Sequence, residues 1–144
     1  MRCVIGIDGG TESLRARVFD TAGHDLGGAT SGYATTFPAP GRAEQDPRDW
    51  WRAIGEAVRG AVSAAGIARD DVAAIGVDTT SATIVVTDAA GEPLRPAILW
   101  MDVRAGAEAA AVLATRDPAL DLNGAGAGPV SPEWMIPKAL WLKR

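Results

Sequence analysis

The chain has 144 residues, of which 47% are hydrophobic and 22% are charged, and its formal net charge at pH 7 is −4. This length suits one domain with a sizeable core. The negative charge argues against general binding to nucleic acid or to an anionic membrane. No apolar run has the length of a membrane span, and the N-terminus lacks a signal peptide. The single cysteine, Cys3, cannot form an internal disulfide, so we expect a cytoplasmic protein.

The segment from Val4 to Asp20 predicts a β-hairpin, because an apolar run breaks at Asp8-Gly9-Gly10 and then resumes as an alternation. Two faces alternate in its second strand: Leu14, Ala16 and Val18 against Arg15, Arg17 and Phe19. Glycines let a backbone approach a phosphate closely, and successive amides there form an anion-binding concavity. Asp8 could hold Mg²⁺ directly or through water, and Arg15 would add positive charge. An ordinary hairpin whose glycines only make the turn is the alternative.

A third strand is expected over residues 26–33, after a polar turn that contains the single histidine, His24. We interpret His24 as a solvated turn residue, because no second metal-binding side chain has a matching spacing. A helix is predicted over residues 47–65, with Asp46 as its cap and Gly66 at its end. Its packing positions recur at helical spacing: Trp50, Trp51, Ile54, Val58, Ala61, Val62 and Ala65.

A second strand–turn–strand is predicted from Ile75 to Val86, and its start echoes the first hairpin. Ile75-Gly76-Val77-Asp78 repeats the pattern of Ile5-Gly6-Ile7-Asp8, which can mean only that two hairpins share turn chemistry. The hydroxyl and small side chains of residues 79–83 follow the end of a strand, where they suit a polyhydroxylated ligand. The alternative is that threonines are simply good strand formers.

The apolar run at residues 96–101 predicts another strand, and Asp102 is expected to cap a helix over residues 103–115. The expected buried stripe of that helix is Ala109, Val112 and Leu113. Trp100, Asp102 and Arg104 combine a flat apolar face, a hydrogen-bond acceptor and a fork of donors, which together can hold a sugar. The alternative is a core tryptophan beside an Asp–Arg pair that fixes the start of the helix.

The glycine-rich segment Asn123–Pro129 follows no strand and lacks the P-loop lysine, so it does not predict a phosphate loop. A last helix is expected over residues 132–143, with Pro137 as a kink or a restart. Its expected apolar face is Trp134, Leu140 and Trp141. The chain stops within this segment, so we expect a fragment that exposes apolar surface and self-associates as a homo-oligomer. The alternation of strands and helices predicts an α/β fold with a mixed sheet.

Four segments carry a family resemblance: IGIDGGTESLRARVFD, GVDTTSAT, LWMDVRA and SPEWMIPKALWLKR. Their order resembles the N-terminal part of the FGGY carbohydrate kinases, and two of them look closest to the ribulokinase-like branch. The resemblance implies a ribonuclease H-like, actin-like ATPase fold with ATP and sugar between two domains. Residues 1–144 would form an incomplete first domain. The implied reaction is ATP-dependent phosphorylation of a sugar or polyol, with a ketopentose such as ribulose as the first expectation and Mg²⁺ as the metal.

The resemblance also implies roles for particular residues. Asp8 matches an acidic residue near Mg²⁺ and the transferred phosphate. The residues implied to face the nucleotide phosphates are Gly9, Gly10, Thr11, Ser13 and Arg15. The residues implied to face the sugar are Ser81, Ala82, Thr83, Trp100, Asp102, Arg104, Glu133 and Lys138.

The family's general base is an aspartate that would lie beyond residue 144, as would the adenine pocket and the second domain. The chain alone should therefore not turn over, because phosphoryl transfer depends on groups from both lobes. Two other functions stay open. One is another actin-like ATPase, such as a chaperone or an acyl-phosphate kinase, which would share the first hairpin but not LWMDVRA. The other is a non-catalytic module that binds sugar or a partner.

Overall fold

The structure is a computed structural model that describes residues 2–122 and 130–144, so the predicted glycine-rich loop at 123–129 lies outside the described residues. The chain forms two compact units, although its length suits one domain. Unit 1 comprises Met1–Thr35 and Asp46–Thr80, and unit 2 comprises Thr36–Gln45 and Ser81–Arg144. None of the helices in the described ranges is both long enough and apolar enough to cross a membrane.

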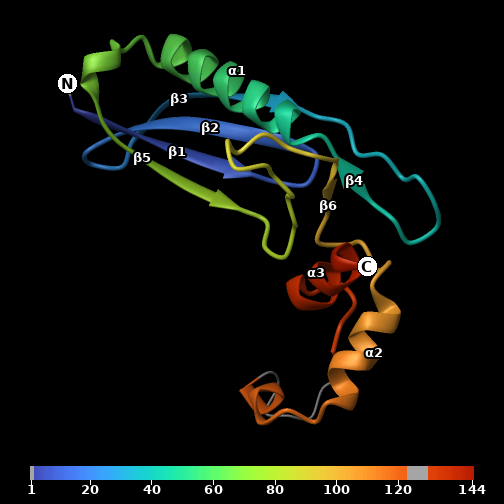
Figure 1. Ribbon diagram of the computed structural model, residues 1–144. Coiled ribbons are helices and arrows are strands. Elements are labelled where there is room, and N and C mark those ends of the chain that lie inside the picture. Colours follow the sequence, from blue (N-terminus) through green and yellow to red (C-terminus); the bar gives the residue numbers. More distant parts are fainter. Residues whose placement is uncertain (1, 123–129) are drawn as a thin grey trace. The chain divides into compact units, whose positions relative to one another are not determined.

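Unit 1 is built on a four-stranded mixed sheet with the order β3-β2-β1-β5 (Figure 1). The first three strands pair antiparallel, while β5 runs parallel to β1. The bounds of the strands are Cys3–Gly9 for β1, Ser13–Asp20 for β2, Asp25–Gly32 for β3 and Val72–Thr79 for β5. The predicted hairpin and mixed sheet are therefore confirmed, and the third strand lies within one residue of its expected bounds.

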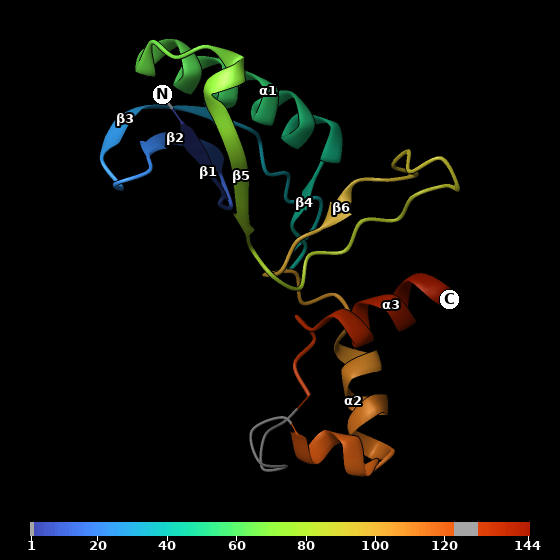
Figure 2. The same cartoon turned by 90° about the vertical axis from the view of Figure 1, so that its left-hand side faces the viewer.

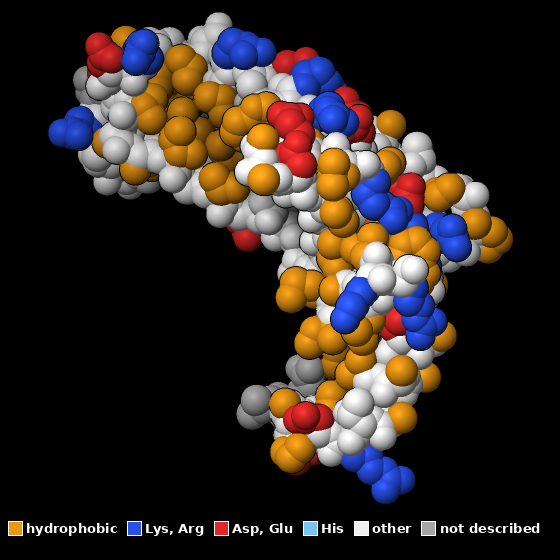
Figure 3. All heavy atoms as spheres, viewed as in Figure 1, with side chains coloured by type: hydrophobic (Ala, Val, Ile, Leu, Met, Phe, Trp, Pro, Cys, Tyr) orange, Lys and Arg blue, Asp and Glu red, His pale blue; other side chains and the backbone are white. Residues whose placement is uncertain are grey.

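The alternation in the hairpin separates a buried face of the sheet from an open one. Leu14, Ala16 and Val18 are at most 4% exposed and form one core with alternate residues of β1. Helix α1 lies over this face (Figures 1 and 2). On the edge strand β5, Ile75 and Val77 are in register with the buried Ile5 and Ile7, yet they are 56% and 63% exposed. Figure 3 shows hydrophobic side chains gathered over this unit.

Helix α1, Pro47–Ala65, has the predicted bounds and caps. The Asp46 side chain accepts a hydrogen bond from the amide of Arg48, and Gly66 adopts the left-handed conformation with a φ of +64°. The expected packing of Trp51 is wrong, because its side chain is 77% exposed, whereas Trp50 is half-buried. The side chains buried against the sheet are small: Ala53, Ala57 and Ala61. Small side chains allow the helix and the sheet to approach closely.

The predicted second hairpin, residues 75–86, is wrong. β5 pairs instead with β1 in parallel, and the register joins Ile5 to Ile75 and Asp8 to Asp78. After β5, Ile84 forms only an isolated bridge with Ile98. A parallel neighbour needs a long crossover connection, which residues between β3 and β5 supply and which includes α1. The two similar segments are therefore adjacent strands of one sheet and not two separate hairpins.

Unit 2 has little strand. β4, Glu44–Gln45, pairs antiparallel with β6, Ala97–Ile98, so the strand expected at 96–101 is shorter than predicted. Two helices follow, α2 at Gly106–Ala114 and α3 at Met135–Lys143. Short 3₁₀ helices occur at Arg69–Asp71 in unit 1 and at Pro118–Leu122 in unit 2.

The predicted start of α2 is wrong. The helix begins after Ala105, whose side chain makes no capping bond, and Asp102 does not cap it. The carboxylate of Asp102 is instead occupied by Arg104 and by the amide of Ala43. These charge-assisted bonds satisfy a buried carboxylate more fully than a helix cap does.

The expected apolar stripe of α2 is also wrong in part. Ala109 is buried, but Leu113 is 45% exposed. Glu108 is buried and pairs with Arg144 at the end of α3, at 2.8 Å. Pro137 neither kinks nor restarts α3, because it lies in the first turn, where a backbone amide would have no partner within the helix.

The close contact between α1 and β3 gives a test with a matched control. A Cβ added at Gly60 would lie 2.6 Å from the Cβ of Ala29, whereas a Cβ at Gly55 would meet only the flexible end of Arg59 at 3.1 Å. Gly60→Ala should therefore lower the free energy of unfolding by about 1–3 kcal/mol through overpacking. Gly55→Ala should raise it by about 0.5–1 kcal/mol through helix propensity. Urea denaturation measures both, and a stabilising Gly60→Ala would contradict the packing described here.

Candidate functional site

The turn between β1 and β2 carries the residues expected to bind phosphate. The amide of Gly10 donates to the carbonyl of Ser13 at 3.0 Å, so this amide closes the turn and is not offered to a ligand. The carbonyl of Gly9 accepts from the amide of Thr80 at 3.3 Å. A Cβ on Gly10 would lie 3.5 Å from Nη1 of Arg15. Glycine thus leaves room beside the guanidinium for a group such as a phosphate oxygen.

Asp8 and Arg15 form an ion pair across the hairpin. Nη1 of Arg15 lies 2.6 Å from Oδ2 of Asp8, and both side chains are 55% exposed. An exposed pair adds little to stability. Both charges stay accessible, and a carboxylate beside a guanidinium can bind a metal ion and a phosphate respectively. Thr11 and Ser13, the two hydroxyl residues of the segment, are half-buried.

Asp78 is a neighbouring carboxylate that the sequence analysis did not select. It lies in β5 in register with Asp8, and both line a hollow of about 470 Å³ together with Arg15 and Arg17. Nowhere in the described ranges do three or more His, Cys, Asp or Glu side chains form a group that could hold a metal ion. Mg²⁺ at Asp8 would therefore depend on phosphate oxygens and water for its other ligands, as this ion commonly does. The repeat of Ile-Gly-X-Asp was the available signal for Asp78.

Tyr33 fixes the turn, and no sequence pattern indicated it. Its Oη donates to the carbonyl of Gly10, and its amide donates to the carbonyl of Glu12 at 3.1 Å. The chain just after β3 thus holds the turn at two points. Burial raises the pKa of Tyr33, and the charge of Asp8 raises it further. The phenol therefore stays protonated and able to donate to the turn.

In unit 2, the segment Ser81–Thr83 is joined to the segment that ends at Trp100. The amide of Trp100 donates to Oγ1 of Thr83 at 3.1 Å. Ala82 has a φ of +59°, in the left-handed region that disfavours a residue with a Cβ. Ser81 is exposed and Trp100 is 38% exposed. Two of the predicted sugar-side segments are therefore brought together.

Asp102 and Arg104 form the predicted pair, but in a buried place. Asp102 is 0% exposed, and the Arg104 side chain is 2% exposed. Nη2 of Arg104 lies 2.7 Å from Oδ2 of Asp102 and also 2.7 Å from Oε1 of Glu44. Burial alone would raise the pKa of the Asp102 carboxyl, but the hydrogen bonds from Arg104 and the amide of Ala43 outweigh it and lower that pKa. Within unit 2 the pair connects residues 102–104 to Ala43 and Glu44. This agrees with the alternative in which the Asp–Arg pair has a structural role.

Trp141 of α3 lies among three guanidinium groups, a cluster that no sequence pattern indicated. The Cζ atoms of Arg104, Arg95 and Arg42 lie 5.0, 5.4 and 5.8 Å from the centre of its ring. Arg95 also pairs with Glu44 at 2.9 Å. Cation–π contacts of this kind fix an aromatic ring against charged groups. Trp141 is thus half-buried by arginine side chains, and it is not part of an exposed apolar face.

Lys138 is 0% exposed, and its Nζ donates to three backbone carbonyls. Glu133 is half-buried, and its amide donates to Oγ of Ser131 at 3.2 Å. The two residues implied to face the sugar therefore differ: Glu133 keeps some accessible surface, whereas Lys138 has none.

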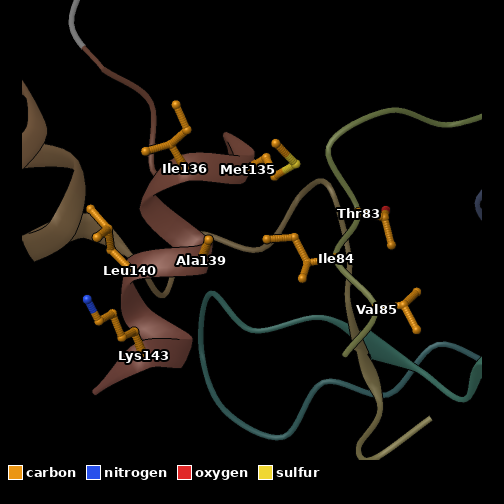
Figure 4. Close-up of a pocket in the computed structure, with 8 residues that line it drawn as sticks. All are labelled: Thr83, Ile84, Val85, Met135, Ile136, Ala139, Leu140 and Lys143. Carbon is orange, nitrogen blue, oxygen red and sulfur yellow. The ribbon is translucent and has the colours of Figure 1, made fainter. Parts of the chain in front are cut away.

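An apolar groove of about 490 Å³ lies between α3 and residues 83–85 (Figure 4). Ile84 points toward α3, and the exposed side chains of α3 that line the groove include Met135 and Leu140. We also expected the exposed apolar surface of the chain to include Trp134 and Trp141, but both are half-buried. The exposed apolar side chains of the last segment are those of Met135, Ile136 and Leu140.

The family of the chain follows from comparison with known sequences. Residues 3–143 match the family described as the FGGY family of carbohydrate kinases, N-terminal domain. The chain belongs to this family. It is 39% identical over 138 residues to a glycerol kinase of Methylorubrum extorquens, covering 94% of this chain and 27% of that protein.

Solved structures agree with this membership. The FGGY chain aligns with a xylulose kinase from Rhodospirillum rubrum with a TM-score of 0.87 and 30% identity, over 99% of this chain and 29% of that one. It shares its fold with Plasmodium falciparum glycerol kinase with ADP, at a TM-score of 0.80 and 19% identity, over 99% of this chain and 28% of that one. The chain thus spans less than a third of the length of these relatives, as part of an actin-like ATPase fold.

Removing the phenol of Tyr33 tests whether it holds the turn. Tyr33→Phe should lower the free energy of unfolding by about 1 kcal/mol, because the carbonyl of Gly10 loses its donor. Amide hydrogen exchange should accelerate in the turn at residues 10–13, while the amides of α1 keep their protection. Unchanged exchange in the turn would show that Tyr33 does not restrain it.

The buried pair in unit 2 gives a second test. Asp102→Ala should cost about 1–3 kcal/mol of unfolding free energy, because the buried Arg104 keeps only Glu44 as a carboxylate partner and the amide of Ala43 loses its acceptor. Asp70→Ala is the control, since that side chain is 94% exposed and pairs only loosely with Arg69; its effect should stay within about 0.5 kcal/mol. Urea denaturation measures both.

The pH dependence of the same pair follows from the direction in which folding shifts the pKa of Asp102. The folded state lowers the pKa of Asp102 from its ordinary 3.8, so the carboxylate stabilises the fold above about pH 4. This contribution is lost as the pH falls through the folded-state pKa. The free energy of unfolding of Asp102→Ala should therefore fall less steeply at acid pH than that of the parent chain. An equal dependence on pH would contradict the ion pair.

Proposed function

We propose that the protein carrying this chain transfers the terminal phosphoryl group of ATP to a hydroxyl of a sugar or polyol. The observation that carries the proposal is the accessible Asp8–Arg15 pair beside the glycines of the β1–β2 turn, in a chain of the FGGY family. Phosphoryl transfer needs little covalent chemistry from the protein, and depends on positioning and neutralisation of charge. An accessible carboxylate and guanidinium beside an open turn fit that requirement.

On the nucleotide side, Asp8 would hold Mg²⁺, which neutralises phosphate charge when bound. Arg15 would bind a phosphate oxygen after its guanidinium separates from the carboxylate of Asp8. The other residues that we propose to face the nucleotide phosphates are Gly9, Gly10, Thr11 and Ser13. Binding of a nucleotide gains support from the fold shared with a glycerol kinase whose structure holds ADP.

On the sugar side, the residues with accessible surface are proposed to contact the substrate: Ser81, Thr83, Trp100 and Glu133. The exposed part of the Trp100 ring can pack against the C–H face of a sugar. Asp102 and Arg104 would act by holding that segment in place, because their side chains are buried. Between Ser81 and Thr83, the backbone carbonyl of Ala82 accepts a hydrogen bond from Nζ of Lys138.

We propose a ketopentose, ribulose first, as the substrate. The support is the resemblance of GVDTTSAT and SPEWMIPKALW to the ribulokinase-like branch. Glycerol and xylulose are the alternatives, since relatives bear the names glycerol kinase and xylulose kinase. The catalytic base and the adenine pocket would be supplied from beyond residue 144, so we expect residues 1–144 alone to be inactive.

The test is ADP release by the complete gene product with ATP and Mg²⁺, across ribulose, xylulose, other polyols and glycerol. One substrate should give release that depends on its presence. Asp8→Ala should lower kcat by about 100-fold or more, as expected when a group that stabilises transition-state charge is lost. Asp25→Ala is the control, because Asp25 also pairs with an arginine across the sheet but lies away from the turn; its kcat should stay near that of the parent.

Other outcomes would favour the competing functions. ATP hydrolysis that does not depend on any sugar would indicate another actin-like ATPase. Sugar binding without turnover by the complete gene product would indicate a binding module. Either result would overturn the kinase proposal.

A further inference from the structure

The amine of Lys138 is fully enclosed within unit 2. Its side chain is 0% exposed. Nζ donates to the carbonyls of Leu99 at 2.6 Å, Trp100 at 3.0 Å and Ala82 at 3.1 Å. A protonated amine has three N–H donors, and all three are used here on backbone oxygens. The amine therefore has neither the surface nor a donor left with which to bind a sugar, although family resemblance alone places it at the substrate.

The three acceptors belong to two segments of unit 2, one at Ala82 and one at Leu99 and Trp100. Ala82 lies between the proposed sugar-side residues Ser81 and Thr83, and Trp100 is itself one of them. The amide of Trp100 also donates to Oγ1 of Thr83, and next to it Ile84 and Ile98 exchange two backbone hydrogen bonds. Lys138 thus connects both proposed sugar-side segments to helix α3.

The bond to Ala82 has a particular consequence for the backbone. With a φ of +59°, Ala82 is held in a conformation that its Cβ disfavours. Such a conformation persists only where the surroundings determine it. The ammonium of Lys138 is the side chain that binds the carbonyl of this strained residue. Without it, the backbone at Ala82 can relax toward an ordinary conformation and shift the neighbouring Ser81, although Thr83 keeps its bond to Trp100.

We propose that Lys138 is a positioning residue, whose buried ammonium holds the segment 81–83 and Trp100 in the arrangement that binds the sugar. It acts through backbone carbonyls and not by contact with the substrate. This inference rests on the proposed kinase function.

The protonation of Lys138 agrees with this role. Burial lowers its pKa to about 8, while the negative charges of Asp102 and Glu133 raise it and the positive charge of Arg104 lowers it. A neutral amine has two N–H donors for three carbonyls, so one bond is lost above that pH. Affinity for the sugar should therefore weaken as the pH rises from 7 to 9.

The test uses the complete gene product and its sugar-dependent ADP release. Lys138→Met keeps the length of the side chain and removes every donor. It should raise the KM for the sugar by about tenfold or more, since a lost charge-assisted hydrogen bond has roughly that effect. The KM for ATP should change less than about twofold. Lys143→Met is the control, because Lys143 lies on the same helix and is exposed; it should leave both KM values unchanged.

A second substitution separates positioning from general stability. Ala82→Gly removes the Cβ that disfavours the left-handed conformation. Added to Lys138→Met, it should recover several-fold of the lost sugar KM, although it restores none of the bonds of the amine. An unchanged sugar KM in Lys138→Met, or no recovery with Ala82→Gly, would overturn the positioning role.

The parent protein decides the question if Lys138→Met does not fold. Its KM for the sugar should rise several-fold between pH 7 and 9 while its KM for ATP stays level. A sugar KM that does not depend on pH in this range would overturn the proposal. If the parent protein shows no sugar-dependent turnover at all, the kinase function itself fails. Turnover with an unaffected Lys138→Met variant overturns only the role of Lys138.

Discussion

The close packing of α1 against the sheet is the constraint on which unit 1 depends. Ala53, Ala57 and Ala61 present a surface so shallow that even a methyl group at Gly60 would meet Ala29. This contact buries one face of β1 and β2 and so determines which side chains of the hairpin stay open. Asp8 and Arg15 are on the open side because Leu14 and Ala16 are needed on the other. The position of the candidate phosphate site thus follows from the packing of the core.

Unit 2 is organised by buried charges. Asp102, Arg104 and Glu44 form one network, and Lys138 caps three carbonyls beside it. Burying such groups is costly unless every donor and acceptor is paired, and complete pairing makes the surrounding backbone rigid. We infer that this rigidity serves the sugar side of the proposed reaction. Charged residues that the sequence suggests as ligand contacts would then act by positioning the residues that contact the ligand.

The local elements of unit 1 could be predicted from the sequence. The hairpin follows from its period-2 alternation, and α1 follows from Asp46, Pro47 and Gly66, because these signals act between residues close in the chain. The second hairpin could not be excluded in this way. Whether β5 pairs with the strand after it or with β1 depends on contacts between residues some 70 positions apart. Tyr33 was missed for the same reason, since its partner Gly10 is distant in sequence.

The sequence by itself determined the family, the α/β class and the β1–β2 hairpin, because motifs and periodicities are local and survive without knowledge of the fold. The tertiary structure decided which of the polar residues are accessible. Trp100, Asp102 and Lys138 have equal standing as sugar ligands in the sequence, yet Trp100 is 38% exposed and the other two are 0% exposed. Burial depends on what long-range contacts bring against a residue, and no property of the residue or its neighbours in the chain records it.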